Sequence, residues 1–498
     1  MTISKTRTGI DYRTALEPFW DDARPRNHVN GSWQDTAQRR ASQDPSTGAD
    51  YTTIPESSRE EVGLAVEAAV LAQPAWAALT VAERAKHLKD FRAALEEHGE
   101  ALALLESIDS GNPLPSTRRD LGLALKYLEE WPGQALAQGG QVHRPYRDGI
   151  SIVTHEPYGV VGKIIAYNHP TLFAIAGLIY PLLAGNTIVI KAAAQTPVAT
   201  LALGALINAA FPAGVVNIIS GGTEAGDAIV THPQIKRVAF TGSDSTALVI
   251  QSRLSASGIV KHFSAELGGK NAFIVCEDAD VEAAANAAFA GLSLTVSSGQ
   301  SCQATARILV HTSISAAFED RLTRLLEDLA VGPAYDTETH MGPLVSETQL
   351  SKVDELVRSG IAEGARLVTG GHRLDRDGYF YAPTLFADTQ AQMRISREEI
   401  FGPVALIQTF DDEQHAIDLV NGVDLGLSAA IWTNDLDRAL RMSSAIQAGY
   451  IWINDANRHY SGAPFGGMKG SGVGREESVD EYFSYTETKA VNIKVRPA

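Results

Sequence analysis

The strongest constraint on the fold of this chain is an alternation between short apolar runs and longer helix-like stretches, which occurs in two series. In the first series, strands are predicted at residues 160–166, 187–191, 215–219 and 237–240. In the second series, they are predicted at residues 272–275, 307–310, 404–410, 427–433 and 450–454. Near-continuous apolar strands that alternate with helices are typical of parallel sheets covered on both faces. We therefore predict an α/β fold with two such sheets, which bind ligands at the carboxyl ends of their strands.

The helices between these strands are predicted from their length and apolar spacing. They cover residues 198–210, a short stretch after Gly222, and residues 281–295, 316–329, 346–363 and 436–446. Two helices are expected before the first series, followed by a third over residues 121–130. The first 50 residues are polar and are expected to be irregular. Residues 151–161 and 490–495 are β-prone and could pair as a sheet edge or an oligomer arm.

Length, charge and cysteine content limit the functions that fit. A chain of 498 residues is too long for one ordinary core, so two or three domains are expected. The net charge of -17 argues against nucleic acid or an anionic membrane surface as a partner. Two cysteines exclude a disulfide framework and a zinc site of several thiolates, and they fit a reducing compartment. The amino-terminal stretch has no apolar signal-peptide core and no run approaches a membrane span, so we expect a cytoplasmic protein without a metal.

Cys302 lies in Ser-Ser-Gly-Gln-Ser-Cys-Gln, where Gly299 and polar neighbours indicate a turn or a helix start. Backbone N–H groups at such a position can lower the pKa of a thiol and can later hold an oxyanion. Cys302 is therefore a candidate nucleophile, and the alternative is an unreactive, partly exposed thiol. Cys276 lies in Ala-Phe-Ile-Val-Cys and is expected to be a small buried core residue.

Two further residues are candidates for acid–base work and for charge stabilisation. Glu266 follows a β-prone stretch and precedes two glycines, so it could point into a cleft and act as a general base. Asn168 follows the first predicted strand of the parallel series, where its amide could donate a hydrogen bond to an oxyanion. The alternatives are a solvated loop glutamate and an ordinary turn before a proline.

Two weaker signals point to a phosphate-bearing ligand. Phe-Thr-Gly-Ser (240–243) places Gly242 and Ser243 between a predicted strand and a helix, where N–H and hydroxyl groups can bind phosphate. Lys191 ends a predicted strand and could meet a ribose or a phosphate, or could be a solvated lysine.

Taken together and in this order, the motifs resemble the aldehyde dehydrogenase superfamily from about Gly31 to Lys494. The matching blocks are Tyr-Asn-His-Pro (167–170), Lys191 with Gln-Thr-Pro (195–197), Phe-Thr-Gly-Ser (240–243), Glu-Leu-Gly-Gly-Lys (266–270), Gly-Gln-Ser-Cys (299–302), Glu-Glu-Ile-Phe-Gly-Pro-Val (398–404), Gly-Tyr-Ile-Trp-Ile-Asn (449–454) and Pro-Phe-Gly-Gly-Met-Lys-Gly-Ser-Gly-Val-Gly-Arg-Glu (464–476). Eight blocks in the family's order make chance similarity negligible.

The resemblance implies three structural parts. A Rossmann-like, parallel-sheet dinucleotide-binding domain would cover residues 1–143 and 162–266, and a second α/β catalytic domain would cover residues 267–475. A small β oligomerisation arm would comprise residues 144–161 and 476–498, in a homodimer or a homotetramer. Exposed strand edges on such an arm are a physical reason to expect pairing between copies.

The resemblance also implies a reaction, the oxidation of an aldehyde to a carboxylic acid with NAD or NADP. Cys302 would attack the aldehyde, and Asn168 with the Cys302 N–H would stabilise the thiohemiacetal oxyanion. After hydride transfer, Glu266 would activate the water that hydrolyses the thioester. The residues implied in cofactor binding are Lys191, Ser243, Gly242, Tyr167, Ala194, Gly268, Glu399 and Phe401.

The chain departs from the family at the cofactor block. Lys-Ala-Ala-Ala (191–194) stands where Lys-Pro-x-Glu is usual, so Ala194 replaces a glutamate that meets the adenosine ribose. That carboxylate would repel a 2′-phosphate, so its absence predicts tolerance of both NAD and NADP. Ala247 stands where a glycine is usual, so the helix start could lie differently against the pyrophosphate.

The residues expected to line the substrate tunnel are more polar than long alkyl aldehydes require. They are His169, Phe173, Ser301, Gln303, Asn457, Arg458, His459 and Phe465. This set predicts an aromatic or polar-substituted aldehyde, or a semialdehyde anchored by Arg458 or a histidine. The alternative is that half of these side chains face elsewhere and that Arg458 is a solvated loop residue.

Two other functions are compatible with the same scaffold. A CoA-acylating dehydrogenase would pass the acyl group to CoA, but relatives of that kind typically lack the general-base glutamate, so Glu266 favours hydrolysis. A structural or binding protein would have no chemical need for Cys302, Glu266 and Asn168 together.

Overall fold

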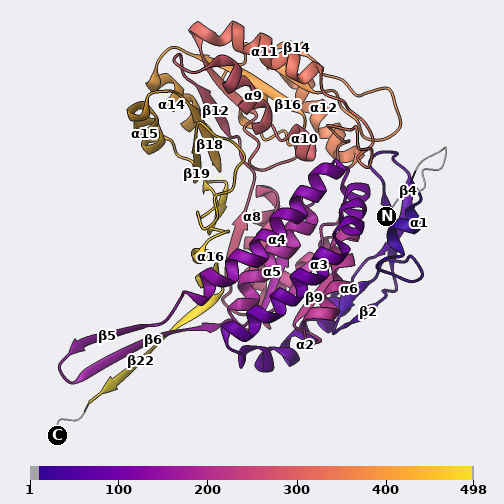
Figure 1. The fold of residues 1–498 in the computed structure, drawn as a ribbon, viewed down its shortest axis with the longest axis vertical. Helices are drawn as coiled ribbons and strands as arrows, with labels where there is room; N and C mark the ends of the chain where they lie inside the picture. Colours follow the sequence, from indigo (N-terminus) through magenta and orange to yellow (C-terminus); the bar gives the residue numbers. More distant parts are fainter. Residues whose placement is uncertain (1–9, 496–498) are drawn as a thin grey trace.

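The computed structural model describes residues 10–495 as two lobes and a projecting arm (Figure 1). Each lobe is built on one sheet, of eight and seven strands respectively. The predicted α/β class with two mainly parallel sheets is therefore confirmed. Residues 1–9 of the predicted cofactor domain and residues 496–498 of the predicted arm lie outside the described residues.

The first sheet has the strand order β2-β1-β9-β8-β7-β10-β11-β21. Its strands are β1 (Asn27–Val29), β2 (Ser32–Gln34), β7 (Val160–Ile164), β8 (Thr187–Lys191), β9 (Val216–Ile219), β10 (Ile235–Thr241), β11 (His262–Glu266) and β21 (Gly472–Val473). The five central strands, β9 to β11 in that order, are parallel. The chain order reverses between β7 and β10, and such a switch point opens a ligand crevice at the strands' carboxyl ends.

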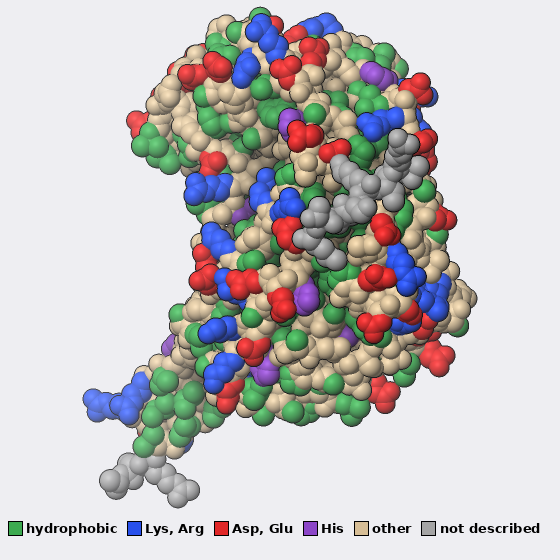
Figure 2. Space-filling view, turned by 45° about the vertical axis from the view of Figure 1, so that its right-hand side comes forward, with side chains coloured by type: hydrophobic (Ala, Val, Ile, Leu, Met, Phe, Trp, Pro, Cys, Tyr) green, Lys and Arg blue, Asp and Glu red, His purple; other side chains and the backbone are tan. Residues whose placement is uncertain are grey.

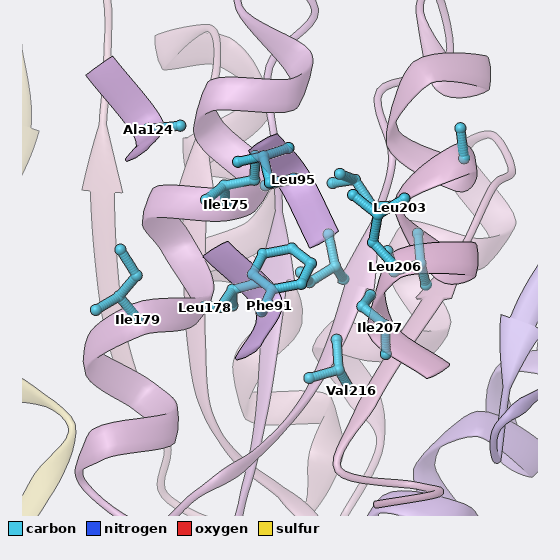
Figure 3. Packing of buried hydrophobic residues seen from close by; sticks show 14 of the residues in the cluster. Phe91, Leu95, Ala124, Ile175, Leu178, Ile179, Leu203, Leu206, Ile207 and Val216 are labelled. Carbon is cyan, nitrogen blue, oxygen red and sulfur yellow. The ribbon is translucent and has the colours of Figure 1, made fainter. Parts of the chain in front are cut away.

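Helices cover both faces of this sheet because its strand residues alternate between two cores. Val161 and Ile188 face a core built with α3 (Val81–Ser110), α4 (Leu114–Leu136), α5 (Pro170–Leu183) and α6 (Pro197–Ala210). Val160 and Val189 face the opposite core, with α2 (Arg59–Ala77), α7 (Thr223–Thr231) and α8 (Asp244–Leu254). Successive strand residues point to opposite faces, which explains this division. Figure 3 shows Phe91 and Leu95 of α3 packed with Ile175 and Leu178 of α5.

The second sheet has the order β14-β15-β16-β13-β12-β18-β19 and forms the upper lobe of Figure 1. Its strands are β12 (Ala272–Val275), β13 (Arg307–His311), β14 (Arg366–Thr369), β15 (Thr384–Ala387), β16 (Val404–Phe410), β18 (Ser428–Trp432) and β19 (Tyr450–Ile453). The accompanying helices are α9 (Val281–Gly291), α10 (Leu294–Ser297), α11 (Ser315–Glu327), α12 (Glu347–Ala362), α13 (Arg394–Arg397), α14 (Glu413–Asn421) and α15 (Leu436–Ala445). All neighbouring strands are parallel except β14 and β15.

The arm is a three-stranded antiparallel sheet of β5 (Gln141–Tyr146), β6 (Gly149–Pro157) and β22 (Thr486–Lys494). The β22–β6 register runs from Thr486 opposite Pro157 to Lys494 opposite Gly149. The predicted pairing of the two β-prone stretches is thus confirmed, but residues 160 and 161 belong to β7 instead. Figure 2 shows hydrophobic side chains along the arm, and its exposed apolar residues are Val142, Tyr146, Val491, Ile493 and Val495.

Some local expectations were wrong. The first 50 residues are not irregular, because they contain α1 (Tyr12–Leu16), β1, β2, β3 (Arg39–Gln43) and the start of β4 (Asp50–Pro55). The helix predicted over 121–130 is much longer in α4. The helix predicted over 281–295 breaks where Ser293 adopts a positive φ of 55°. The remaining elements are the two-stranded sheet of β17 (Leu425–Gly426) with β20 (Met468–Lys469), and α16 (Val479–Ser484).

Within residues 10–495, every helix is too short or too polar to span a lipid bilayer.

Candidate active site

A cavity of about 850 Å³ lies at the carboxyl ends of the parallel strands of the first sheet. Its walls include the segments that follow β7, β8, β10 and β11, so the cavity crosses the switch point between β7 and β10. Cys302 contributes to the wall from the turn before β13 of the second sheet. The cavity therefore joins the crevice of the first sheet to a thiol carried by the second.

Two contacts hold the Cys302 turn in place. The Asn271 side chain donates hydrogen bonds to the Cys302 carbonyl at 2.6 Å and to the Ala304 carbonyl at 3.1 Å. Gly299 has a φ of +76°, and a Cβ there would lie 2.3 Å from the Gly402 carbonyl oxygen, so only glycine fits this approach. The expectation that Cys302 lies on a turn is confirmed.

The pKa of the Cys302 thiol is raised overall, because the expected lowering by a backbone N–H is outweighed. Burial is the largest cause, and the carboxylates of Glu399 and Glu266 add to it. Both effects disfavour a thiolate. Cys276 is 2 % exposed, which confirms its predicted place in the core.

Glu266 ends β11 and also lines the cavity. It is 7 % exposed, and neither carboxylate oxygen has a hydrogen-bond partner among residues 10–495. Burial raises the pKa of this carboxyl well above its ordinary value; Glu476 raises it further, and Arg475 opposes the shift. A buried carboxyl without a partner, directed at a cavity, has the environment of a general base tuned upward.

Asn168 lies in the bend between β7 and α5 and is 4 % exposed. Its backbone carbonyl accepts a hydrogen bond of 2.7 Å from the Asn112 side chain. The bend is therefore anchored through the backbone, while the residue contributes to the same cavity wall as Cys302 and Glu266. The three residues selected from the sequence thus line one cavity.

The residues implied in binding the nicotinamide end also meet there. Glu399 Oε1 accepts a 2.9 Å hydrogen bond from the Gly269 N–H. Burial raises the pKa of Glu399 to about 7, although that hydrogen bond opposes the shift. A Cβ at Gly268 would lie 2.2 Å from Glu399 Oε2, so any other residue here would displace the Glu399 carboxylate. The rings of Phe401 and Tyr167 meet edge to face, with centroids 5.8 Å apart.

At the other end of the cavity, Ser243 caps α8 by accepting a hydrogen bond from the Thr246 N–H. Gly242 and Ala194 line the wall nearby. Lys191 is 7 % exposed, and its ammonium donates to the Ala192 carbonyl at 3.1 Å. Burial lowers the pKa of Lys191 to about 8, and Arg40 contributes to the shift. A helix amino end and a buried lysine suit the pyrophosphate and ribose of a dinucleotide.

Of the eight residues predicted for the substrate tunnel, only Phe173 lines this cavity. The ring centroids of Phe173 and His169 are 5.7 Å apart, and His169 Nδ1 lies 2.7 Å from Asp120 Oδ2. Ser301 is 5 % exposed beside Cys302. Phe173 therefore belongs to the cavity wall, whereas His169 and Ser301 lie in the segments beside it.

Two more tunnel candidates, Gln303 and Phe465, contact a second histidine, His459. His459 lies 2.7 Å from Glu477 Oε2 and 2.7 Å from Gln303 Oε1, and its ring is 5.1 Å from that of Phe465. Burial lowers the pKa of His459, but the carboxylates of Glu477 and Asp120 outweigh it, so the net shift is upward.

Two candidates point elsewhere. The Asn457 amide donates to the Ala290 carbonyl at 2.7 Å, which is a structural role. The Arg458 side chain is exposed, with its guanidinium 5.1 Å from the Tyr460 ring, as the solvated alternative for this residue anticipates.

Sequence reasoning missed several residues that contact the candidate site residues or their neighbours. Lys163, only 3 % exposed, lies 3.1 Å from Glu476 Oε1. Burial would lower the pKa of Lys163, but the neighbouring carboxylate of Glu476 raises it overall. Lys163 is the one charged residue in an otherwise apolar strand, and this could have marked it. Asn271, Asp120 and Glu477 carried no such signal.

Comparisons with known proteins agree with this geometry. The model of the aldehyde dehydrogenase family matches residues 33–491. Aldehyde dehydrogenase tropH of Talaromyces stipitatus is 39% identical over 96% of this chain and 95% of its own length. Human retinaldehyde dehydrogenase 3 is 38% identical over 94% of this chain and 92% of its own length. The NAD+ complex of an aldehyde dehydrogenase from Bacillus cereus has a TM-score of 0.94 at 35% identity, with 100% of both chains covered.

The predicted reaction class, oxidation of an aldehyde with a nicotinamide dinucleotide, is thereby confirmed. The chain belongs to the aldehyde dehydrogenase family.

Proposed function

We propose that this enzyme oxidises an aromatic or polar-substituted aldehyde by the hydrolytic route, with Cys302 as nucleophile, Asn168 as oxyanion donor and Glu266 as general base. The observation that carries this proposal is the Glu266 carboxyl. It is buried, it has no hydrogen-bond partner in the described part of the chain, and it lines the same cavity as the Cys302 thiol. A CoA-acylating enzyme has no use for a base that activates water.

The steps follow from the environment of each residue. The Cys302 sulfur attacks the carbonyl carbon as the thiol loses its proton to solvent water. The Asn168 amide and the Cys302 N–H donate hydrogen bonds to the thiohemiacetal oxygen. Loss of hydride from the carbon leaves a thioester on Cys302. Glu266 then takes a proton from water, which hydrolyses the thioester, frees the thiol and releases the acid.

The cofactor would lie across the switch point of the first sheet. Glu399 would hold its nicotinamide ribose and Phe401 its ring, while Gly242, Ser243 and the amino end of α8 would face the pyrophosphate. Lys191 would meet the adenosine ribose. NAD or NADP supplies the hydride acceptor of the oxidation. Tyr167 and Gly268 support this arrangement by their contacts with Phe401 and Glu399.

The substrate class is inferred from the two histidine–carboxylate pairs. His169 with Asp120 and His459 with Glu477 offer acceptors for a hydroxyl or amide group of a substrate. Gln303, the residue that follows Cys302, lies 2.7 Å from His459 of the second pair. Phe173 lines the cavity and Phe465 packs beside His459, so both would present aromatic surface to a ring-bearing substrate.

A carboxylate-bearing semialdehyde fits these pairs less well. Its anion would meet the charges of Asp120 and Glu477, and Arg458 is directed at the Tyr460 ring. We therefore rank semialdehydes below neutral aromatic and hydroxylated aldehydes.

The proposed function is tested by following reduced nicotinamide at 340 nm with purified enzyme and no CoA. The panel contains benzaldehyde, a hydroxybenzaldehyde, heptanal as the alkyl aldehyde of equal carbon number, and succinic semialdehyde. We expect the hydroxybenzaldehyde to have the highest kcat/KM and Cys302→Ala to abolish turnover. A requirement for CoA would overturn the hydrolytic route, and a preference for heptanal would overturn the substrate class.

We further propose that the arm pairs with another copy in a homodimer or a homotetramer. All six residues of β5 are exposed, and apolar side chains lie along the arm. Exposed strand edges of this kind favour pairing. Light scattering after size-exclusion chromatography tests this, and a monodisperse monomer would contradict it.

The unpaired state of both cysteines supports the proposal that the enzyme works in the cytoplasm.

A further inference from the structure

The cavity wall at the proposed adenosine end is bordered by a charged pair from another part of the chain. Arg40 lies on β3 and its guanidinium Nη2 donates to the Ala194 carbonyl, while its Nε donates to Glu56 Oε2 at 2.9 Å. Glu56 Oε1 in turn accepts a 2.6 Å hydrogen bond from the Gly222 N–H. Ala194 and Gly222 both line the cavity, so Arg40 and Glu56 bracket its edge.

The Arg40 guanidinium has N–H groups left for a ligand. No described residue accepts a hydrogen bond from Arg40 Nη1, and the side chain is 36% exposed. Lys191 Nζ donates only to the Ala192 carbonyl among the described residues, so it also has donors left. Arg40 and Lys191 are close enough to affect each other electrostatically. Two cations with unused donors therefore meet beside Ala194.

The carboxylates at this edge are already engaged. Glu56 is held by Arg40 and by the Gly222 N–H. Glu224 also lines the cavity, and its carboxylate accepts a hydrogen bond of 3.1 Å from the Arg59 N–H. Asp227 forms ion pairs with Arg59 and Arg253. At position 194 itself there is only a methyl group, so no acidic side chain there opposes an anion.

We propose that Arg40 is a specificity-determining residue that binds the 2′-phosphate of NADP, together with Lys191. A guanidinium with free N–H groups is the side chain best suited to bind a phosphate, because it offers several donors in a fixed plane. The inference rests on the proposed cofactor site and adds a residue from β3 to it. It changes the expectation for the cofactor from mere tolerance of NADP to a preference for the phosphorylated form.

The first measurement is direct binding, which needs no turnover. Calorimetry compares adenosine 2′,5′-bisphosphate with adenosine 5′-monophosphate on the wild-type enzyme and on Arg40→Ala. We expect the wild type to bind the bisphosphate at least tenfold more tightly, and Arg40→Ala to lose about tenfold for the bisphosphate with no change for the monophosphate. Equal loss for both ligands, or no loss for either, would overturn the proposal.

Arg39→Ala is the matched control, because Arg39 precedes Arg40 on β3 and points to the other face. Its guanidinium is bound to Asp35, Thr53 and the Pro25 carbonyl. We expect it to leave the preference unchanged, and an equal loss in this variant would overturn the proposal. Arg40→Lys should keep part of the preference, since it keeps the charge but not the planar donors.

A double variant separates the loss of a cation from the release of a carboxylate. In Arg40→Ala, Glu56 is left without its partner and could itself repel a phosphate. Arg40→Ala with Glu56→Gln removes that charge, and we expect the preference to stay lost. Recovery of the preference in the double variant would mean that Glu56, and not Arg40, sets it.

Turnover gives the second readout, as the ratio of kcat/KM for NADP to that for NAD. We expect this ratio to fall about tenfold in Arg40→Ala while kcat/KM with NAD is kept. An unchanged ratio would overturn the role of Arg40. An enzyme inactive with every aldehyde would refute the proposed function, and the binding comparison would still decide the role of Arg40.

Discussion

Replacing Glu266 by glutamine should separate the two halves of the reaction. The side chain is 7 % exposed and no described residue hydrogen-bonds to its carboxylate, so glutamine fills the same space without breaking a bond. It cannot accept a proton from water. A positioned general base contributes ~10²–10⁴-fold, so we expect steady-state turnover to fall by that factor.

The first half-reaction should survive in this variant. Rapid mixing with aldehyde and cofactor should give a burst approaching one reduced nicotinamide per active site, followed by slow release of acid. Acid quenching during the slow phase should recover acyl-enzyme attached to Cys302. Steady-state turnover equal to that of the wild type would refute the role of Glu266. Absence of the burst would refute the assumption that the base acts chiefly after hydride transfer.

The pH dependence of thioester hydrolysis tests the same role of Glu266. Because burial and Glu476 raise the pKa of Glu266, the carboxylate form that acts as base becomes populated only as the pH rises. The rate of thioester hydrolysis in the wild type should therefore increase with pH above the range in which an ordinary glutamate loses its proton. In the glutamine variant, this limb should be absent. An identical rising limb in both enzymes would assign it to another group.

Three further predictions concern residues around the site and the core. Asn168→Ala should lower kcat by ~10²–10³-fold, because it removes the proposed oxyanion donor. The melting temperature should change little, because Asn112 binds the backbone carbonyl of residue 168, which alanine keeps. An unchanged kcat would contradict the oxyanion role. Gly268→Ala would put a Cβ 2.2 Å from Glu399 Oε2, so the Kd for reduced cofactor, measured by fluorescence, should rise tenfold or more. Gly63→Ala is the control, because a Cβ at Gly63 meets nothing within 4 Å, and we expect it to leave this Kd unchanged. Burial raises the pKa of Glu106 to about 8. Between the ordinary pKa of a glutamate and pH 8, the unfolded chain therefore releases a proton that the folded chain keeps. The free energy of unfolding should fall by up to ~1.4 kcal/mol per pH unit in this range. Glu106→Gln should flatten the melting temperature against pH in that range, and Glu97→Gln on the exposed face of α3 should not.

The strands that could be predicted from the sequence are those whose residues are nearly all apolar and buried. Residues 187–191, 272–275 and 404–410 were predicted with the bounds of β8, β12 and β16. β1 could not be found this way, because it buries Asn27 and His28. Their hydrogen-bond partners, Ser57 and Asn208, are distant in sequence, so the local composition reads as a loop.

In the candidate site, too, residues with a local sequence pattern could be predicted, and residues brought together only by folding could not. Cys302, Glu266 and Asn168 each follow a local pattern of strand end, glycine or turn, and the family resemblance joined them. The pair of Lys163 and Glu476 spans 313 positions, and its place beside Glu266 arises only in the folded chain. The two histidine–carboxylate pairs escaped prediction for a similar reason, since Asp120 and Glu477 lie outside every motif.

The return of the chain's end to the first lobe has a consequence for how the protein is made. Residues 472–473 complete the edge of the first sheet as β21, next to Glu266, and the Tyr485 carbonyl accepts a hydrogen bond from Asn186. During synthesis on the ribosome, the first lobe emerges hundreds of residues before these segments do. The nascent first lobe therefore has an open sheet edge beside Glu266 until the end of the chain is made, and a prematurely terminated chain cannot complete the surroundings of this carboxyl.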